Sequence, residues 1–413
     1  MTSDLRPNTA MPLPAKAVAA GAPSLLRTMN QRLLLELLFS TGPVTRPKLA
    51  RLSGLSQPTV IAALADLEDA GLVKAVGHAH TAPGRAPMVY EVDPTVGAVI
   101  GVDIGREWMR LLITDLAGTR LCQRDTRNTA EDPDELIDAV VQLVQQGTDE
   151  AGLGPGVITH TVVGSPGAYG ADSKQVRFAA NLPGWGILTV AAALRDRLAG
   201  ELTVENDANL AALGEYTYGA GRETGQFVYL TIGTGVGIGI VLDGKLYRGF
   251  KGSAGEIAHL PVGEKQPNRR RGDAPRGMLE ESFGASALVK RARAIGMKDP
   301  VNAAAIFAAA REGDELAMEV VLAEGKALAY VVASICALLD PELIVVGGGV
   351  GQNLDLLLIG MTQELEELSP HRPTMAVGDL GRDAVVAGAI ALGLERAKEA
   401  VFTARTGVAA GAV

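Results

Sequence analysis

One stretch decides the fold of the larger part of the chain: Phe227-Val-Tyr-Leu-Thr-Ile-Gly-Thr-Gly-Val-Gly-Ile-Gly-Ile-Val-Leu242. Its two ends are apolar segments of strand length and the glycines between them allow a tight turn, so it predicts a β-hairpin. A second hairpin is predicted upstream, with strands at 98–103 and 109–116 around the turn Ile104-Gly-Arg-Glu107. Helical stretches follow each hairpin, and the two together predict a duplicated α/β unit. The elements predicted further downstream are a long helix at 318–339, a strand with a glycine loop at 343–350 and a closing helix at 383–397.

The composition limits the class of protein. A length of 413 residues exceeds one compact core and predicts two or three domains. The 47% hydrophobic and 21% charged residues are ordinary for a globular protein and exclude wholesale disorder. The two cysteines, Cys122 and Cys336, exclude a disulfide framework and fit a reducing cytoplasm. No apolar run reaches the ~18 residues of a membrane span, and we expect no secretory signal.

The N-terminal part has the order of a small helical module. Residues 1–23 are rich in alanine, proline and threonine and predict a flexible arm, and 24–41 have the apolar spacing of an amphipathic helix. Ser56 is placed to cap a third helix, which Gly71 ends. The other predicted elements are helices at 46–52 and 57–70 and strands at 72–76 and 87–92. Three helices followed by a β-hairpin are typical of a winged helix-turn-helix, whose third helix enters the major groove of DNA.

The charge of this module supports contact with DNA. Residues 1–95 carry nine Lys and Arg against seven Asp and Glu, a difference of +2, which leaves −11 for the rest of a chain of net charge −9. Between Val44 and Ala65 there are three cations and no acid, which favours phosphate binding. The predicted DNA contacts are Arg46, Lys48, Arg51, Ser56, Gln57, Pro58, Thr59, Ala63 and Arg85.

Some of these residues have a predicted role in reading sequence. Gln57 can bond adenine, and Thr59 or Ala63 can meet a thymine methyl, because all three are expected off the apolar stripe of the third helix. Arg85, at the tip between the two predicted strands, fits a minor-groove contact. The alternative is a three-helix protein-interaction domain, since short basic helices are often only solvated.

Five motifs follow one another in the larger module: Ser165-Pro-Gly167, Asn181-Leu-Pro-Gly-Trp185, Glu205-Asn-Asp-Ala-Asn209, Leu230-Thr-Ile-Gly-Thr-Gly-Val-Gly-Ile-Gly239 and Ala254-Gly-Glu-Ile-Ala-His259. In this order they resemble the signature of the ROK family (repressors, open reading frames, kinases). Residues 54–60 are similar to the recognition helix of the family's regulators, so the resemblance spans about residues 24–400 and is of the xylose- and N-acetylglucosamine-repressor type.

The resemblance implies an α/β fold class. A winged helix-turn-helix is followed by a two-lobed actin-like ATPase (ribonuclease H-like) domain, with a hexose-class sugar in the cleft between the lobes. The expected parts are a flexible arm at 1–23, the winged helix-turn-helix at 24–92, a first lobe at 93–205 plus 383–400, a second lobe at 206–382 and a frayed tail at 401–413.

The sugar site implied by the resemblance has chemistry suited to hydroxyl groups. Asn206 and Asp207 offer an amide and a carboxylate side by side, and in a kinase Asp207 would be the base that accepts the hydroxyl proton. The expected sugar ligands are Asn206, Asp207, Glu256, His259 and Glu280, with Gly167 and Asn181 beside them. The alternative roles are a helix cap for Asp207 and an ordinary surface histidine for His259.

The turn after the first predicted strand departs from the family's kinases, which carry Asp-x-Gly-Gly-Thr there. In this chain Arg106 replaces a glycine, and Glu107 replaces the threonine expected to meet polyphosphate. Like charges ~4 Å apart repel by about 4 kcal/mol at an effective dielectric near 20. Alternatively, Arg106 fills the phosphate site itself. We therefore expect no catalytic residues and no kinase activity.

The zinc motif of the family is also changed. Aligning on Gly277 places Arg271, Asp273 and Met278 at the family's three cysteine positions, so we expect no metal and no other cofactor. The arginine-rich run 266–276 is expected to be a solvated loop, with contact to DNA, an acidic partner or a phosphorylated ligand as alternatives.

These observations predict a cytoplasmic transcriptional regulator of carbohydrate metabolism, and the expected mode of regulation is repression. The expected partners are a double-stranded DNA operator, a sugar or sugar-derivative effector and further copies of the chain in a homodimer or tetramer, with no membrane contact. Two alternatives stay open. One is a sugar kinase with an appended DNA-binding domain, and the other is a regulator governed by a protein partner.

Overall fold

The computed structural model describes residues 23–78, 87–170, 175–177, 190–260, 279, 282–298, 302–370 and 372–407. The chain divides into two compact units, which are treated separately below. Unit 1 takes residues up to Asp93 together with the chain end from Phe402, and unit 2 takes Pro94–Val401.

Unit 1 has the predicted helices and hairpin. Its helices are α1 (Pro23–Thr41), α2 (Arg46–Ser53) and α3 (Gln57–Asp69), and its strands are β1 (Val44–Thr45), β2 (Val73–His78) and β3 (Met88–Val92). The sheet order is β1-β3-β2, and β1 was not expected from the sequence. Ser56 caps α3 by accepting a hydrogen bond from the backbone N–H of Thr59, and Gly71 follows the helix in the left-handed region.

The end of the chain differs from the predicted frayed tail. Helix α13 extends from Ala384 to Thr406, beyond the predicted end of the closing helix. Within unit 1, Phe402 is only 2% exposed and the guanidinium of Arg32 lies 4.9 Å from its ring centroid. Residues 401–406 are therefore ordered helix, because an aromatic side chain is buried there.

Unit 2 contains two five-stranded sheets of the same topology. The first has the order β10-β7-β4-β5-β6 and the second β15-β14-β11-β12-β13. Counted along the chain, the first two strands of each sheet (β4 and β5, or β11 and β12) form an antiparallel hairpin. The fourth and fifth strands along the chain (β7 and β10, or β14 and β15) extend the sheet as parallel strands. The first sheet is built from β4 (Ala98–Ile104), β5 (Trp108–Asp115), β6 (Arg120–Arg127), β7 (Ile158–Ser165) and β10 (Glu201–Asn206), and the second from β11 (Phe227–Ile232), β12 (Val236–Leu242), β13 (Lys245–Leu246), β14 (Leu343–Gly347) and β15 (Thr374–Val377). The predicted duplicated α/β unit is confirmed.

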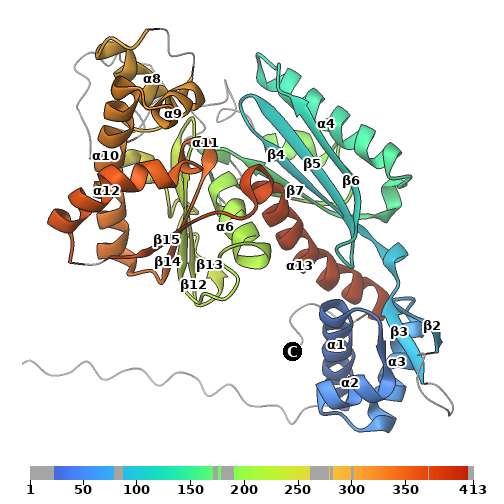
Figure 1. The fold of residues 1–413 in the computed structure, drawn as a ribbon. Helices are drawn as coiled ribbons and strands as arrows, with labels where there is room; N and C mark the ends of the chain where they lie inside the picture. The colour runs from blue at the N-terminus through green and yellow to red at the C-terminus, as the bar shows by residue number, and fades with distance from the viewer. Residues whose placement is uncertain are drawn as a thin grey trace, which may run out of the picture. The chain divides into compact units, whose positions relative to one another are not determined.

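Helices cover both faces of each sheet. Two of them, α6 (Asp207–Tyr218) and α13, lie between the sheets and contribute to the cores on either side (Figure 1). They approach closely, since a Cβ on Gly388 would meet the carbonyl oxygen of Leu210 at 1.7 Å. The outer helices are α4 (Pro133–Glu150) and α5 (Val190–Arg195) on the first sheet, and α8 (Ala285–Ala294), α9 (Ala303–Arg311), α10 (Glu315–Leu339) and α12 (Leu354–Leu368) on the second.

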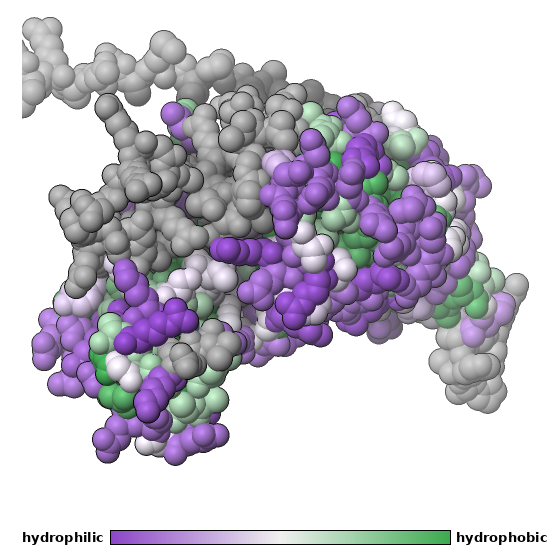
Figure 2. Space-filling model, turned by 90° about the horizontal axis from the view of Figure 1, so that it is seen from above, coloured by the Kyte–Doolittle hydropathy of each residue, from purple (hydrophilic) through white to green (hydrophobic). Residues whose placement is uncertain are grey.

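Helix α10 is the most apolar of the described helices. By length and composition alone it could cross a membrane, yet over half of its most apolar stretch is buried. Eleven of its residues are buried, and nine of these, among them Val320, Leu328 and Ile335, belong to the core of the second sheet. Helix α10 is therefore a core helix. On the face of the molecule shown in Figure 2, hydrophilic residues cover most of the described surface.

Candidate functional site

The corner where β10 ends and α6 begins positions the first two predicted site residues. Asn206 is the N-cap of α6, because its Oδ1 accepts a hydrogen bond from the backbone N–H of Asn209 at 3.0 Å. Its Nδ2 donates to the carbonyl oxygen of Gly167 at 3.2 Å. Asp207 follows as the first helical residue, with Oδ1 2.8 Å from the backbone N of Ala208. The cap is Asn206 rather than Asp207, which leaves the second carboxylate oxygen of Asp207 for other partners.

A cavity of about 190 Å³ opens beside this corner. Its walls include the glycine turn of the second hairpin, residues 233–237. The predicted sugar-site residues that line it are Gly167, Asn206, Asp207, Glu256 and His259. It is smaller than the ~300–1,000 Å³ typical of sites for drug-sized ligands, so its size suits a small polar molecule. Asn181 and Glu280 lie outside the described residues.

Glu256 and His259 reach the cavity through a tight turn. Residues Ile257–His259 form a 3₁₀ helix, and the backbone N–H of His259 donates to the carbonyl oxygen of Glu256. In a 3₁₀ helix residues three apart lie above one another, which explains why both line one cavity. Glu256 and His259 therefore lie on one face of this turn.

The protein around Asp207 raises the pKa of its carboxyl group to about 7. Loss of solvation is the largest cause and the negative charge of Asp103 is the second, although Asp207 keeps partial exposure to the cavity. Asp103, which is only 6% exposed, also has a raised pKa, about 6, because burial outweighs the effect of Arg110. The two carboxyl groups can therefore change protonation state near neutral pH.

A second cavity, of about 320 Å³, has Asp207 in common with the first. Here Arg110 donates to Asp103, with Nη1 3.0 Å from Oδ2. The two residues are direct partners in the β4–β5 register, so the predicted hairpin pairing was the signal that could have identified Arg110. Within the described part of the chain, the buried Nε of Arg110 has no hydrogen-bond partner.

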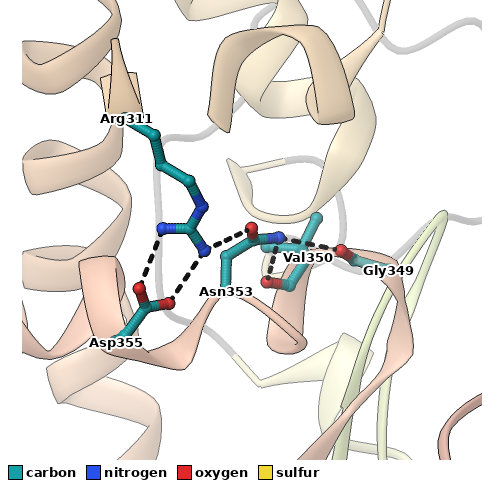
Figure 3. A network of polar contacts seen from close by, with 5 residues as sticks. All are labelled: Arg311, Gly349, Val350, Asn353 and Asp355. Carbon is teal, nitrogen blue, oxygen red and sulfur yellow. Dashed lines mark hydrogen bonds and ion pairs between the residues drawn. The ribbon is translucent and has the colours of Figure 1, made fainter. Parts of the chain in front are cut away.

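One wall of the second cavity is held by a polar network (Figure 3). Asn353 donates to the carbonyl oxygens of Gly349 and Val350 in α11 (Gly348–Gly351), a short helix where a glycine loop was expected. Arg311 binds both Asp355, in a bidentate pair at 2.8 and 3.0 Å, and the Oδ1 of Asn353 at 3.1 Å. The network thus ties α9 and α12 to the helix α11 that lines the cavity.

The turn between β4 and β5 differs in part from expectation. Arg106 lines the first cavity, in agreement with the idea that its side chain takes up space there. Glu107 lines neither cavity, and its exposed carboxylate lies 4.0 Å from Arg127 on β6. The structure places the Glu107 carboxylate beside Arg127, and the repulsion between Glu107 and a bound phosphate stays a prediction.

In unit 1, most of the predicted DNA contacts that the structure describes are accessible. Lys48, Arg51, Ser56, Gln57 and Pro58 are exposed, and Arg46 and Thr59 are half-buried. Arg46 lies over the ring of Tyr90, 5.5 Å from its centroid, and Thr59 shares a hydrogen bond with Ser56. Arg85 lies outside the described residues.

The structure corrects the prediction that Ala63 is an exposed DNA contact. It is 3% exposed and packs inward with Val60, Leu64 and Leu67, whereas the apolar Ile61 is 47% exposed. The reason is helical geometry, since residues 60, 63, 64 and 67 follow the i, i+3, i+4, i+7 pattern of one face. Ala63 is therefore not an exposed base contact, and Ile61 takes that place on the surface of α3.

The expected metal positions Arg271, Asp273 and Met278 and the arginine-rich run 266–276 lie outside the described residues. In the part of the chain that the structure describes, no three His, Cys, Asp or Glu side chains are grouped as a metal site.

Comparison with known proteins gives two family matches. Residues 99–396 match the ROK family, and residues 30–74 match a winged helix-turn-helix DNA-binding family. The chain is 26% identical to the xylose repressor of Caldicellulosiruptor bescii over 90% of this chain and 97% of that one. It is 31% identical to the glucokinase of Thermotoga maritima over 63% of this chain and 84% of that one.

Solved structures give the same fold. A ROK family transcriptional regulator, described as a homolog of the Escherichia coli MLC protein, has a TM-score of 0.73 at 21% identity and covers 92% of this chain and 99% of its own. A ROK family glucokinase from Streptomyces griseus, in complex with glucose and AMPPNP, has a TM-score of 0.62 at 27% identity over 72% of this chain and 100% of its own. The match to the regulator covers 92% of this chain and so reaches into its N-terminal part, whereas the match to the kinase covers only 72%.

Proposed function

This chain belongs to the ROK family, and on that premise we propose that it is a sugar-responsive transcriptional repressor. Its winged helix-turn-helix binds an operator, and a monosaccharide or monosaccharide derivative changes the affinity of that binding. A relative named xylose repressor, matched over 90% of this chain, supports this function. As a DNA-binding regulator it acts in the cytoplasm.

The cavity beside the β10–α6 corner carries the proposal. Neighbouring hydroxyl groups of a sugar need donors and acceptors placed side by side, and buried polar contacts discriminate strongly against ligands that lack them. Asn206 supplies an amide, Asp207 and Glu256 supply carboxylates, and His259 supplies an imidazole on the wall of one small cavity. Gly167 fixes the Asn206 amide from behind. We propose these residues as the sugar ligands, with Asn181 and Glu280 completing the site.

The proposed DNA surface consists of the α2 cations and the first turn of α3. Lys48 and Arg51 are exposed and form no ion pair with other described residues, so they are available for phosphates. Gln57 begins α3, where a recognition helix contacts base edges. We propose a homodimer or dimer of dimers in which two such modules bind a pseudo-palindromic operator. Sugar binding then shifts the population between conformers with different operator affinity.

Two arginines support a non-enzymatic role. The Arg106 side chain lines the cavity at the turn that is glycine in the family's kinases, and Arg110 already neutralises Asp103. Arg106 reduces the space that ATP requires, and Arg110 reduces the unpaired negative charge that the metal ion of ATP requires.

The second candidate function is a sugar kinase. It is favoured by Asp207, whose raised pKa of about 7 suits a general base, and by the 31% identity to a glucokinase. A coupled assay with ATP and a panel of hexoses separates the candidates. ATP-dependent turnover that disappears in Asp207→Asn would establish kinase activity. It would overturn the proposal that this regulator has no enzymatic activity.

The main test uses the full-length protein. An operator is first selected from a random DNA pool, and its affinity is then followed by fluorescence anisotropy during titration with xylose, glucose and other monosaccharides. We expect one sugar to stabilise the protein against heat and to change operator affinity at least tenfold. If DNA binds but every sugar leaves both the thermal midpoint and operator affinity unchanged, the sensor role fails and a constitutive DNA-binding protein remains.

A further inference from the structure

We propose that Arg248 is a positioning residue of the sugar site. It connects the β10–α6 corner, which carries Asn206 and Asp207, to the loop that carries Glu256 and His259. The inference rests on the proposed function, because it assigns to Arg248 the alignment of the two halves of the proposed sugar ligands. Arg248 itself does not line the cavity, so its effect passes through its neighbours.

The first half of the connection is Glu205, the residue before the site. Its side chain is nearly buried, and its carboxylate accepts three hydrogen bonds. Oε1 accepts from the backbone N–H of Asn206 at 3.0 Å and from Nδ2 of Asn209 at 2.9 Å, and Oε2 accepts from Nε of Arg248 at 2.6 Å. Two of these donors belong to the capping turn of α6, so the orientation of Glu205 controls where Asn206 is held.

The second half is the backbone of Arg248 and the loop that follows. The carbonyl oxygen of Arg248 accepts from the backbone N–H of Ala254 at 3.1 Å, which closes the loop onto itself. The carbonyl oxygen of Gly255 then accepts from Ile238 on β12 at 3.2 Å, immediately before Glu256. One residue therefore fixes the corner with its side chain and the loop with its main chain.

This arrangement predicts an effect on the site as well as on overall stability. The Arg248 side chain is 41% exposed, but its partner Glu205 is only 11% exposed, and a nearly buried carboxylate that loses its counter-ion destabilises the fold. Binding constellations also need their side chains held within about 0.5 Å of the productive geometry. Without the Arg248 guanidinium, Glu205 loses one of its three hydrogen bonds and can turn toward solvent. The β10–α6 corner and the loop with Glu256 and His259 are then no longer connected through this side chain.

The experiment compares Arg248→Met, which keeps the length of the stem, with Arg248→Lys and with a matched control, Arg197→Met. Arg197 forms an ion pair of the same length with Asp138, 2.6 Å, and is 43% exposed, and neither residue lines the cavity. The control matches the exposure of Arg248 but not that of its partner, since Asp138 is 68% exposed and Glu205 only 11%. Sugar affinity of the full-length protein is measured by calorimetry with xylose and glucose. We expect Arg248→Met to weaken binding at least tenfold, Arg248→Lys to restore it to within about threefold, and Arg197→Met to leave it unchanged.

A second measurement is independent of any sugar. Hydrogen exchange of the ligand-free protein is expected to be faster in Arg248→Met at residues 206–209 and 252–259, and unchanged there in Arg197→Met. Equal sugar affinity in Arg248→Met and wild type, or a loss in Arg197→Met as large as in Arg248→Met, overturns the proposal. If no sugar binds the wild type, the proposed function fails, and hydrogen exchange alone decides on Arg248: unchanged protection at both segments overturns it.

Discussion

Asp103 and Asp207 line the same cavity, and the negative charge of Asp103 contributes to raising the pKa of Asp207 to about 7. The first strand of the first hairpin thus acts on a residue that begins α6, far away in the sequence. Among the residues that the structure describes, Asp103 has an arginine partner and Asp207 has none, so the protonation state of Asp207 is the more sensitive of the two to a ligand.

The first prediction is a pH-dependent sugar affinity. The Asp207 carboxyl group accepts hydroxyl hydrogen bonds more strongly when it is ionised, and with a pKa of about 7 it is mostly protonated at pH 6. Sugar affinity should therefore rise between pH 6 and pH 8, by up to about tenfold per pH unit below the pKa. Calorimetric titration at pH 6, 7 and 8 measures this. In Asp207→Asn the dependence should disappear, and a wild-type affinity that is the same at all three values contradicts the assignment.

The second prediction concerns the stability of the ligand-free protein. The folded pKa of Asp207, about 7, lies above the unfolded value of about 3.9, so the folded state binds more protons between these values. The free energy of unfolding contributed by this group is therefore fully present below about pH 4 and is lost as pH rises toward 7. Relative to wild type, Asp207→Asn should become more stable from pH 5 to pH 8 in urea unfolding. A constant difference between the two proteins would show that the pKa is not raised.

The third prediction is that Arg110→Met destabilises unit 2 in a pH-dependent way. The variant leaves the buried Asp103 carboxylate without its counter-ion, which costs about 3 kcal/mol when the carboxylate is charged. At pH 8 the loss should be near that value, and at pH 5 it should be smaller because Asp103 is then protonated. Urea unfolding followed by Trp108 fluorescence measures both.

The matched control for this variant is Arg311→Met. Arg311 also forms an ion pair with an aspartate, Asp355, but both side chains are exposed. Exposed pairs contribute about 0–1 kcal/mol, so this variant should lose little at either pH. Equal losses in the two variants would mean that burial of Asp103 is not the cause.

Much of the fold was predictable because glycine turns and apolar periodicity are local signals. The two hairpins and the duplicated unit follow from the glycines around Gly105 and Gly235 and from the apolar runs beside them. The extension of α13 was not predictable in this way. Its last turn is ordered by Phe402 packing within unit 1, a contact between distant parts of the sequence.

In the candidate site, too, residues marked by a local sequence motif were predicted and a residue whose role depends on a distant contact was not. Asn206 and Asp207 are adjacent in sequence and were expected from the resemblance to the ROK family, and the structure brings Glu256 and His259 to the same cavity. Arg248 was missed because its proposed role depends on a contact with Glu205 that no local pattern encodes. A sequence motif therefore predicts the proposed ligand groups better than the groups that hold them in place.

The fourth prediction tests the corrected face of α3. Ala63 is buried against the core of unit 1, so Ala63→Leu should overpack it and cost about 1–3 kcal/mol. Ala62 is exposed on the same helix, and Ala62→Leu should change stability by less than about 0.5 kcal/mol. Thermal unfolding of both variants measures the difference. A well-tolerated Ala63→Leu would return Ala63 to the surface that can face DNA.

The last prediction separates phosphate contacts from base contacts in the proposed DNA surface. Lys48 is an exposed cation of α2, so Lys48→Ala should weaken binding to operator and random DNA alike and reduce the slope of log affinity against log salt by about 1. Gln57 begins α3, and Gln57→Ala should instead cost about 1–3 kcal/mol on the operator alone, with the salt slope unchanged. Anisotropy titrations at several salt concentrations, with operator and random duplexes, distinguish these outcomes. Because a protein-interaction module binds no DNA through either residue, the absence of both effects in a protein that still binds its operator would move the DNA surface away from α2 and α3.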